Sequence, residues 1–71
     1  MIRQKVTSSA LHSVGYDRET LILEIEFRNG HIYRYLGVPD SCWAGLMSAS
    51  SKGLYFDAEI RNRFYCEKAT G

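Results

Sequence analysis

The dipeptide Asn29-Gly30 is the feature that most constrains the fold of this chain. Asn-Gly between two β-rich runs is the strongest short-range signal for a β-hairpin, because both residues tolerate the left-handed backbone that a tight turn requires. Before it, residues 21–27 alternate apolar and polar side chains, as expected for a strand with one buried face. After it, residues 31–36 are rich in aromatic and β-branched residues, so a partner strand is predicted there.

Two registers are open to this hairpin. A two-residue turn would place Ile25 opposite Arg34, which mixes apolar and polar partners. A three-residue loop with Gly30 in the left-handed region instead gives apolar pairs on one face and an ion pair on the other. We therefore predict the second register, with these pairs: Ile25 with Tyr33, Leu23 with Tyr35, and Glu24 with Arg34.

A further strand is predicted over residues 11–16, where apolar residues again alternate with small or polar ones. A tight turn after Tyr16 would pair Tyr16 with Leu21 and Val14 with Leu23. All three strands then contribute to one apolar face, which a three-stranded sheet must cover to be stable. The predicted inner residues are Val14, Tyr16, Leu21, Leu23, Ile25, Phe27, Tyr33 and Tyr35.

Two helices in the second half of the chain are predicted to provide this cover. Asp40 or Ser41 can cap a helix that runs to about Ala49, and Gly45 inside it indicates close packing against a neighbour. Ser50 or Ser51 can cap a second helix that runs to about Tyr65. The fold class is α+β: a three-stranded antiparallel β-meander followed by two helices packed on one face (β-β-β-α-α).

The length of 71 residues leaves room for one domain, predicted over 10–66 between a flexible arm (1–9) and a frayed tail (67–71). A net charge of +1 means that any contact with phosphates must come from a local patch. The sequence has no apolar run of membrane-spanning length and no signal-peptide core, so we expect a cytoplasmic protein without membrane contact. Its two cysteines lack the spacing of a zinc site, and we expect no metal and no cofactor.

Several motifs occur in the order found in the KTSC domain family, which this chain resembles over nearly its whole length. The resemblance implies a small domain that occurs alone in bacteria and at the carboxy terminus of some lysyl-tRNA synthetases. It also implies RNA binding as a function and brings no catalytic residues. The residues that produce the resemblance are Ser8-Ser9-Ala10-Leu11, Val14-Gly15-Tyr16-Asp17, Phe27 with Gly30, Tyr33-Arg34-Tyr35, Val38-Pro39, and Gly53-Leu54-Tyr55-Phe56 with Ile60-Arg61.

The second predicted helix offers a candidate RNA-binding stripe. Arg61, Tyr65 and Lys68 follow helical spacing and interleave basic with aromatic groups, which is typical of single-strand binders. Arg63 and Lys52 could extend this stripe. The alternative is a solvated face, because Asp57 and Glu59 precede Arg61 and Arg63 by four residues, the spacing of helical ion pairs.

The strands offer a second set of candidates. Tyr33 and Tyr35 could stack on bases, but the predicted register puts them on the inner face and favours core tyrosines. Arg34 on the outer face could contact a phosphate, or Glu24 could neutralise it. The remaining outer residues form an apolar patch that either covers the amino-terminal arm or joins a second copy or another protein, and they are Ile22, Ile32 and Leu36.

Catalysis is not expected from this sequence. The candidate nucleophiles and acid–base groups stand in no recognisable arrangement, although the helix dipole could mildly activate Cys42. These groups are His12, His31, Cys42 and Cys66. The sequence thus predicts a small non-catalytic binding module, for RNA or, alternatively, for another protein or a second copy.

Overall fold

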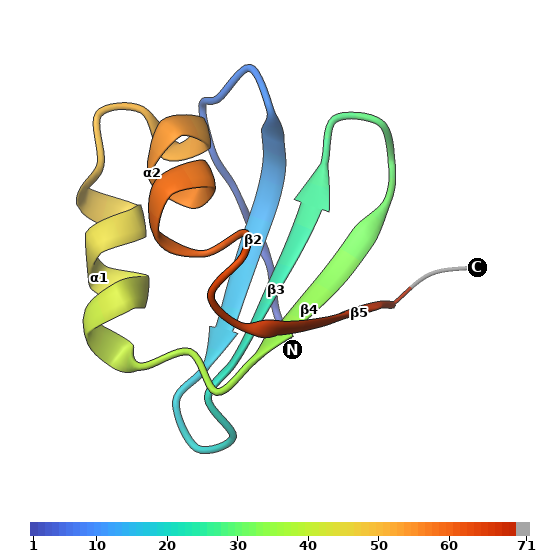
Figure 1. Ribbon diagram of the computed structural model, residues 1–71. Coiled ribbons are helices and arrows are strands. Elements are labelled where there is room, and N and C mark those ends of the chain that lie inside the picture. Colours follow the sequence, from blue (N-terminus) through green and yellow to red (C-terminus); the bar gives the residue numbers. More distant parts are fainter. Residues whose placement is uncertain (70–71) are drawn as a thin grey trace.

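The computed structural model describes residues 1–69 as one antiparallel sheet with two helices packed on one face (Figure 1). The strands follow one another across the sheet in chain order. The α+β prediction is confirmed, and the sheet gains a strand at each edge, β1 and β5. The elements are β1 (Gln4–Lys5), β2 (Leu11–Asp17), β3 (Ile22–Phe27), β4 (Ile32–Leu36), α1 (Asp40–Ser48), α2 (Lys52–Glu59) and β5 (Tyr65–Lys68).

The β3–β4 hairpin has the predicted register, with Ile25 opposite Tyr33, Leu23 opposite Tyr35 and Glu24 opposite Arg34. The Phe27 N–H donates to the His31 carbonyl at 2.9 Å, which closes a loop of three residues. Gly30 lies in that loop at φ 90°, a conformation that side chains rarely adopt. The Asn29-Gly30 turn therefore sets which side chains face the helices.

The predicted pairing of β2 with β3 is wrong by two residues. Tyr16 lies opposite Leu23, and Val14 lies opposite Ile25. The turn is longer than expected because Asp17 Oδ1 accepts the Glu19 N–H at 2.9 Å, which extends the loop through Leu21. A shift of two leaves every strand residue on its predicted face, but Leu21 leaves the strand, adopts φ 59° and is 40% exposed.

Helix α1 follows Pro39, and its first helical residue is Asp40, so neither Asp40 nor Ser41 is the capping residue. Helix α2 is capped as expected by Ser51, whose side chain accepts the Leu54 N–H at 3.3 Å. The predicted close approach at Gly45 is also present. A Cβ there would overlap the Tyr55 hydroxyl and lie 2.6 Å from ring carbon Cζ, so the glycine allows α1 and α2 to touch.

The predicted extension of α2 to Tyr65 is wrong, because the helix ends at Glu59. Ile60 leaves helical geometry at φ −122°, and a turn follows in which the Arg63 N–H donates to the Ile60 carbonyl at 3.1 Å. Tyr65–Lys68 then pairs with the free edge of β4, which satisfies backbone groups that a helix would leave unpaired. Glu67 and Lys68, expected in a frayed tail, thus belong to β5, and residues 70 and 71 lie outside the described residues.

The amino-terminal residues pack along the other edge of the sheet, where Gln4 lies opposite Val14 and Lys5 opposite Ser13. Gly15 permits this close approach, since a Cβ there would lie 2.7 Å from the Ile2 carbonyl oxygen. The core between sheet and helices consists of Leu11, Val14, Leu23, Ile25, Tyr35, Val38, Leu46, Phe56 and Ile60. Within residues 1–69, no helix has the length and apolarity needed to cross a membrane.

Candidate functional site

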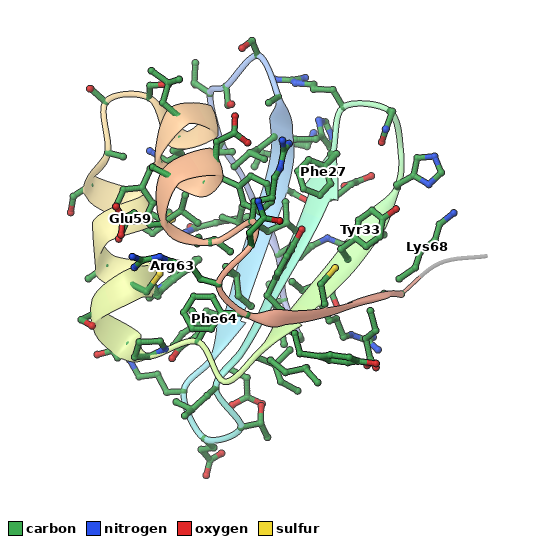
Figure 2. All side chains as sticks on the ribbon, in the orientation of Figure 1. Phe27, Tyr33, Glu59, Arg63, Phe64 and Lys68 are labelled. Carbon is green, nitrogen blue, oxygen red and sulfur yellow. The ribbon has the colours of Figure 1, made fainter. Side chains whose placement is uncertain are left out.

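An aromatic cluster lies on the inner face of the sheet, the face that the helices cover. The Phe56 ring of α2 is its centre and lies 5.3 Å from the Phe27 ring and 5.4 Å from the Tyr35 ring, both in edge-to-face geometry. Tyr33 continues the cluster outward, with its ring 5.9 Å from that of Phe27, and Figure 2 shows these two side chains next to one another, with Tyr33 on the side away from α2. The cluster therefore runs from the core to the side of the sheet that lies beyond α2.

Basic groups lie against this cluster both at its centre and at its outer end. The guanidinium of Arg61 lies over the Phe56 ring at 5.5 Å from its centroid, and Lys68 of β5 lies directly opposite Tyr33. The imidazole of His31 lies 6.4 Å from the Tyr33 ring with the two planes 29° apart. We call this set the aromatic–basic surface: Phe27, His31, Tyr33, Arg61 and Lys68.

The two tyrosines of β4 differ in burial. Tyr35 is a core residue as predicted, and burial together with the adjacent Cys66 raises the pKa of its hydroxyl. Tyr33 lies farther from the helices and is only half-buried. One ring of the Tyr-x-Tyr motif thus supports the core, while part of the other remains accessible to a ligand.

The structure separates the residues of the predicted helical stripe. Arg61 and Lys68 come to the same face of the sheet, although β5 rather than a helix places Lys68 there. Tyr65 lies opposite Leu36 on the outer face and is 70% exposed. The stripe as one helical face is therefore wrong, because a strand alternates its side chains between two faces.

The remaining basic candidates have structural partners. Lys52 donates to the carbonyls of Met47 and Ala49, both at 3.3 Å, and so closes the carboxyl end of α1. The predicted ion pairs Asp57–Arg61 (3.1 Å) and Glu59–Arg63 (3.4 Å) are both formed. Arg63 and Glu59 lie on the side of α2 toward α1, away from Tyr33 and Lys68 (Figure 2).

Arg34 lies on the outer face in an ion cluster with Glu24. Its Nε donates to Glu24 Oε1 at 2.9 Å, as the register predicted, and Arg3 of the amino-terminal segment binds the other carboxylate oxygen. The Glu24 side chain is only 6% exposed. Burial raises the pKa of Glu24, but the hydrogen bonds from Arg34 and Arg3 outweigh it and leave the pKa below its ordinary value.

The outer apolar candidates also share one face. Ile22, Ile32 and Leu36 are all partly buried, and Tyr65 of β5 lies beside Leu36. The amino-terminal segment pairs with β2 at the far edge of the sheet. Its Arg3 reaches Glu24, so the segment covers part of the outer face beside β2 and β3.

A small cavity adjoins the aromatic–basic surface and was not predicted from the sequence. Its volume is about 240 Å³. Three segments that are distant in the sequence form it. They approach one another closely, since a Cβ added to Gly53 would lie 3.4 Å from the Ala10 Cβ. The lining residues are Ser9, Ala10, Phe27, Ser51, Gly53, Leu54, Phe56, Asp57 and Arg61.

The groups weighed for catalysis are dispersed. Burial raises the pKa of the Cys42 thiol and outweighs the lowering by a hydrogen bond with Tyr55. His12 lies on β2, with its Nδ1 3.4 Å from Arg28 Nη1. In the part of the chain that the structure describes, no group of three or more His, Cys, Asp or Glu residues could hold a metal ion.

The fold and this surface define a small α+β domain with an aromatic strand motif at its centre. The chain belongs to the KTSC domain family, whose model matches residues 7–65. A crystal structure of a KTSC domain protein from Yersinia pestis superimposes with a TM-score of 0.95, at 46% identity and 97% coverage of both chains.

Two kinds of relative are found among sequences. An uncharacterized protein of Stutzerimonas stutzeri is 42% identical over 65 residues, with 92% of each chain covered. A lysine–tRNA ligase of Nostoc punctiforme is 36% identical over 64 residues, and the match spans 90% of this chain but 11% of the ligase. The domain therefore occurs both in proteins of about its own length and within a much longer one.

Proposed function

We propose that the chain is a non-catalytic binding module for single-stranded RNA and that the aromatic–basic surface is its contact site. The observation that favours this function most is the half-buried Tyr33 ring, with Lys68 directly opposite and His31 beside it. Single-strand binders combine aromatic rings, on which bases stack, with cations that follow the phosphates. The surface offers both on one face of a sheet.

Each component has an expected contribution. A base stacked on an aromatic side chain contributes about 1–3 kcal/mol. Lys68 supplies positive charge at the border of the rings, which a chain of net charge +1 must do locally, whereas Asp57 balances the charge of Arg61. Affinity should therefore be modest and should depend on Tyr33.

The relatives support an RNA ligand. Lysine–tRNA ligases, by their name, act on tRNA, and this chain matches a segment of the Nostoc punctiforme ligase. A domain joined to such an enzyme and also present in short proteins fits a portable RNA-binding module. This proposal also places the protein in the cytoplasm, where such an RNA would be met.

The direct test is binding of a fluorescein-labelled mixed-sequence 12-nucleotide RNA, followed by fluorescence anisotropy. Tyr33→Ala should weaken binding by about tenfold, since it removes one stacking contact. Tyr65→Ala, also a tyrosine but on the outer face, is the matched control and should change little. Equal effects of the two substitutions would show that the inner face is not the site.

Salt dependence tests the electrostatic part independently. If Lys68 neutralises one phosphate, the slope of log K against log salt should be about −0.7 for a single strand. Lys68→Gln should bring that slope close to zero. A slope near zero for the wild-type protein would contradict a phosphate contact at this surface.

The second candidate function is a protein-interaction surface or homodimer on the outer face. Tyr65, 70% exposed beside Leu36, is the observation that favours it. The molar mass in solution, measured by light scattering at increasing protein concentration, tests the homodimer. A dimer that Ile22→Lys or Leu36→Lys dissociates would support this function, whereas a monomer at all concentrations excludes self-association there.

A further inference from the structure

We infer that the cavity beside Arg61 receives one extruded guanine base of the bound RNA. This inference rests on the proposed function, because it names the base that the same site selects. The cavity and the aromatic–basic surface share two residues, Phe27 and Arg61. An RNA strand that stacks on Tyr33 can therefore place a neighbouring nucleotide at the cavity mouth.

The size of the cavity suits a single base. Its volume of about 240 Å³ lies below the roughly 300–1,000 Å³ of pockets that hold drug-sized ligands. Phe27 and Phe56 supply aromatic wall, and Ser9 and Ser51 supply hydroxyl groups. A planar heteroaromatic ring with polar edges matches this lining, whereas a long flexible chain does not.

The charge of the lining argues against a phosphate in the cavity itself. Asp57 lies there beside Arg61, and its carboxylate would repel a second anion. A carboxylate instead accepts hydrogen bonds from N–H groups. The occupant must therefore carry donors, which the edges of several bases provide.

The Arg61–Asp57 pair presents a donor next to acceptors. Arg61 Nη2 binds Asp57 Oδ1 at 3.1 Å, and the other carboxylate oxygen and further guanidinium N–H groups are left for a ligand. The side chains are 57% and 52% exposed, so a ligand can reach both.

This arrangement matches the Watson–Crick edge of guanine. Guanine offers the acceptor O6 beside the donors N1–H and N2–H₂, which meet a guanidinium and a carboxylate in the same order. Cytosine carries the reverse pattern, and uracil and adenine provide a single donor on that edge. The ion pair thus offers guanine a donor beside acceptors, as cytosine does in a base pair.

The test uses ten-nucleotide RNAs of nine uridines with one central guanosine, adenosine, cytidine or inosine, plus an all-uridine control. The guanosine RNA should bind the wild-type protein about tenfold more tightly than the others. Inosine lacks the N2 amino group and should lose most of that preference. Equal affinity for guanosine and adenosine RNAs would overturn the inference.

Two matched variants connect the preference to the cavity. Asp57→Asn should abolish the guanosine preference, and the all-uridine affinity should stay at or above its wild-type value because a carboxylate that repels phosphates is removed. Glu59→Gln alters the other acid–arginine pair, Glu59–Arg63, which lies outside the cavity, and should leave the preference intact. A guanosine preference that survives Asp57→Asn, with thermal melting confirming a folded variant, would also overturn the inference.

The two proposals can fail separately. If the RNAs bind through Tyr33 with no base preference, the guanine site is wrong and the binding module stands. If Tyr33→Ala lowers neither the guanosine preference nor the affinity for the guanosine RNA, the cavity stands and the stacking role of Tyr33 is wrong. If none of the RNAs binds the wild-type protein, both proposals are wrong.

Discussion

Gly45 shows how one residue sets the distance between the two helices. Substituting Gly45 by alanine should lower the free energy of unfolding by about 1–3 kcal/mol, because the new methyl group would overlap the Tyr55 hydroxyl. The destabilisation by this overlap should therefore be larger than the ~1 kcal/mol by which alanine favours a helix over glycine. Urea denaturation measures the difference.

The Tyr55→Phe background is the control, since it removes the oxygen that overlaps. Gly45→Ala should cost less in that background than in the wild-type protein. Equal costs in the two backgrounds would mean that the Tyr55 hydroxyl is not what limits the approach of the helices.

Glu24 makes stability depend on pH. Its pKa is lower in the folded protein than the ordinary value of 4.5, so its contribution is present above that value and is lost as the pH falls through the folded pKa. The free energy of unfolding should therefore decrease in acid. Glu24→Gln should flatten this decrease and, at pH 7, lower stability by about 1–3 kcal/mol because Arg3 and Arg34 lose their shared partner.

Thermal melts from pH 3 to 7 measure this dependence. Glu19→Gln, in the exposed β2–β3 turn, changes the net charge by the same amount without touching the ion cluster. If both variants show the same acid dependence, Glu24 is not its source.

At the scale of elements, β5 is a strand at the point where the sequence predicted the end of a longer helix α2. The pairing of Tyr35 with Cys66 and of Tyr33 with Lys68 predicts strong Hα–Hα nuclear Overhauser effects between the members of each pair. The Ala69 N–H donates to the Ile32 carbonyl at 2.7 Å, so Ala69 and Ile32 form a hydrogen-bonded pair. The two pairs named above are therefore non-hydrogen-bonded pairs, in which the Cα atoms are closer together. Medium-range helical contacts over 61–65 instead would contradict the strand.

The sequence predicted helices and strands best where local spacing and burial agree. The β3–β4 register was predictable because Gly30 and the alternation of residues 21–27 both select it. The end of α2 was not predictable, because Phe64 would pack against the core as a helical i+4 partner of Ile60 and also does so as the residue just before β5. The free edge of β4 decides between these alternatives, and it exists only after the sheet has formed.

At the scale of the whole molecule, the candidate site depended on tertiary contacts. Arg61 and Lys68 were recognised from the sequence as members of one stripe, and the fold does bring them to one face, for a different reason. The cavity was missed because residues 9–10, Phe27 and the start of α2 are far apart in the chain. Local periodicity contains no information about such a junction.

The amino-terminal segment should contribute to the stability of the whole domain. Arg3→Met should lower the free energy of unfolding by about 1–3 kcal/mol, because it leaves one oxygen of a nearly buried carboxylate without its partner. Lys5→Met, in the same amino-terminal segment and exposed, is the matched control and should have little effect. Guanidinium denaturation measures both, and equal losses would mean that the segment acts only through its backbone pairing.

The Glu24 ion cluster also has a consequence for how the hairpin avoids misfolding. A slip of β3 against β4 by one residue would turn the Glu24 carboxylate toward the apolar layer and separate it from both arginines. Such a slip would therefore lose both the apolar pairing and a charged group's partners together. The cluster thus destabilises misaligned strand pairings relative to the native one, in addition to the constraint that the turn itself imposes.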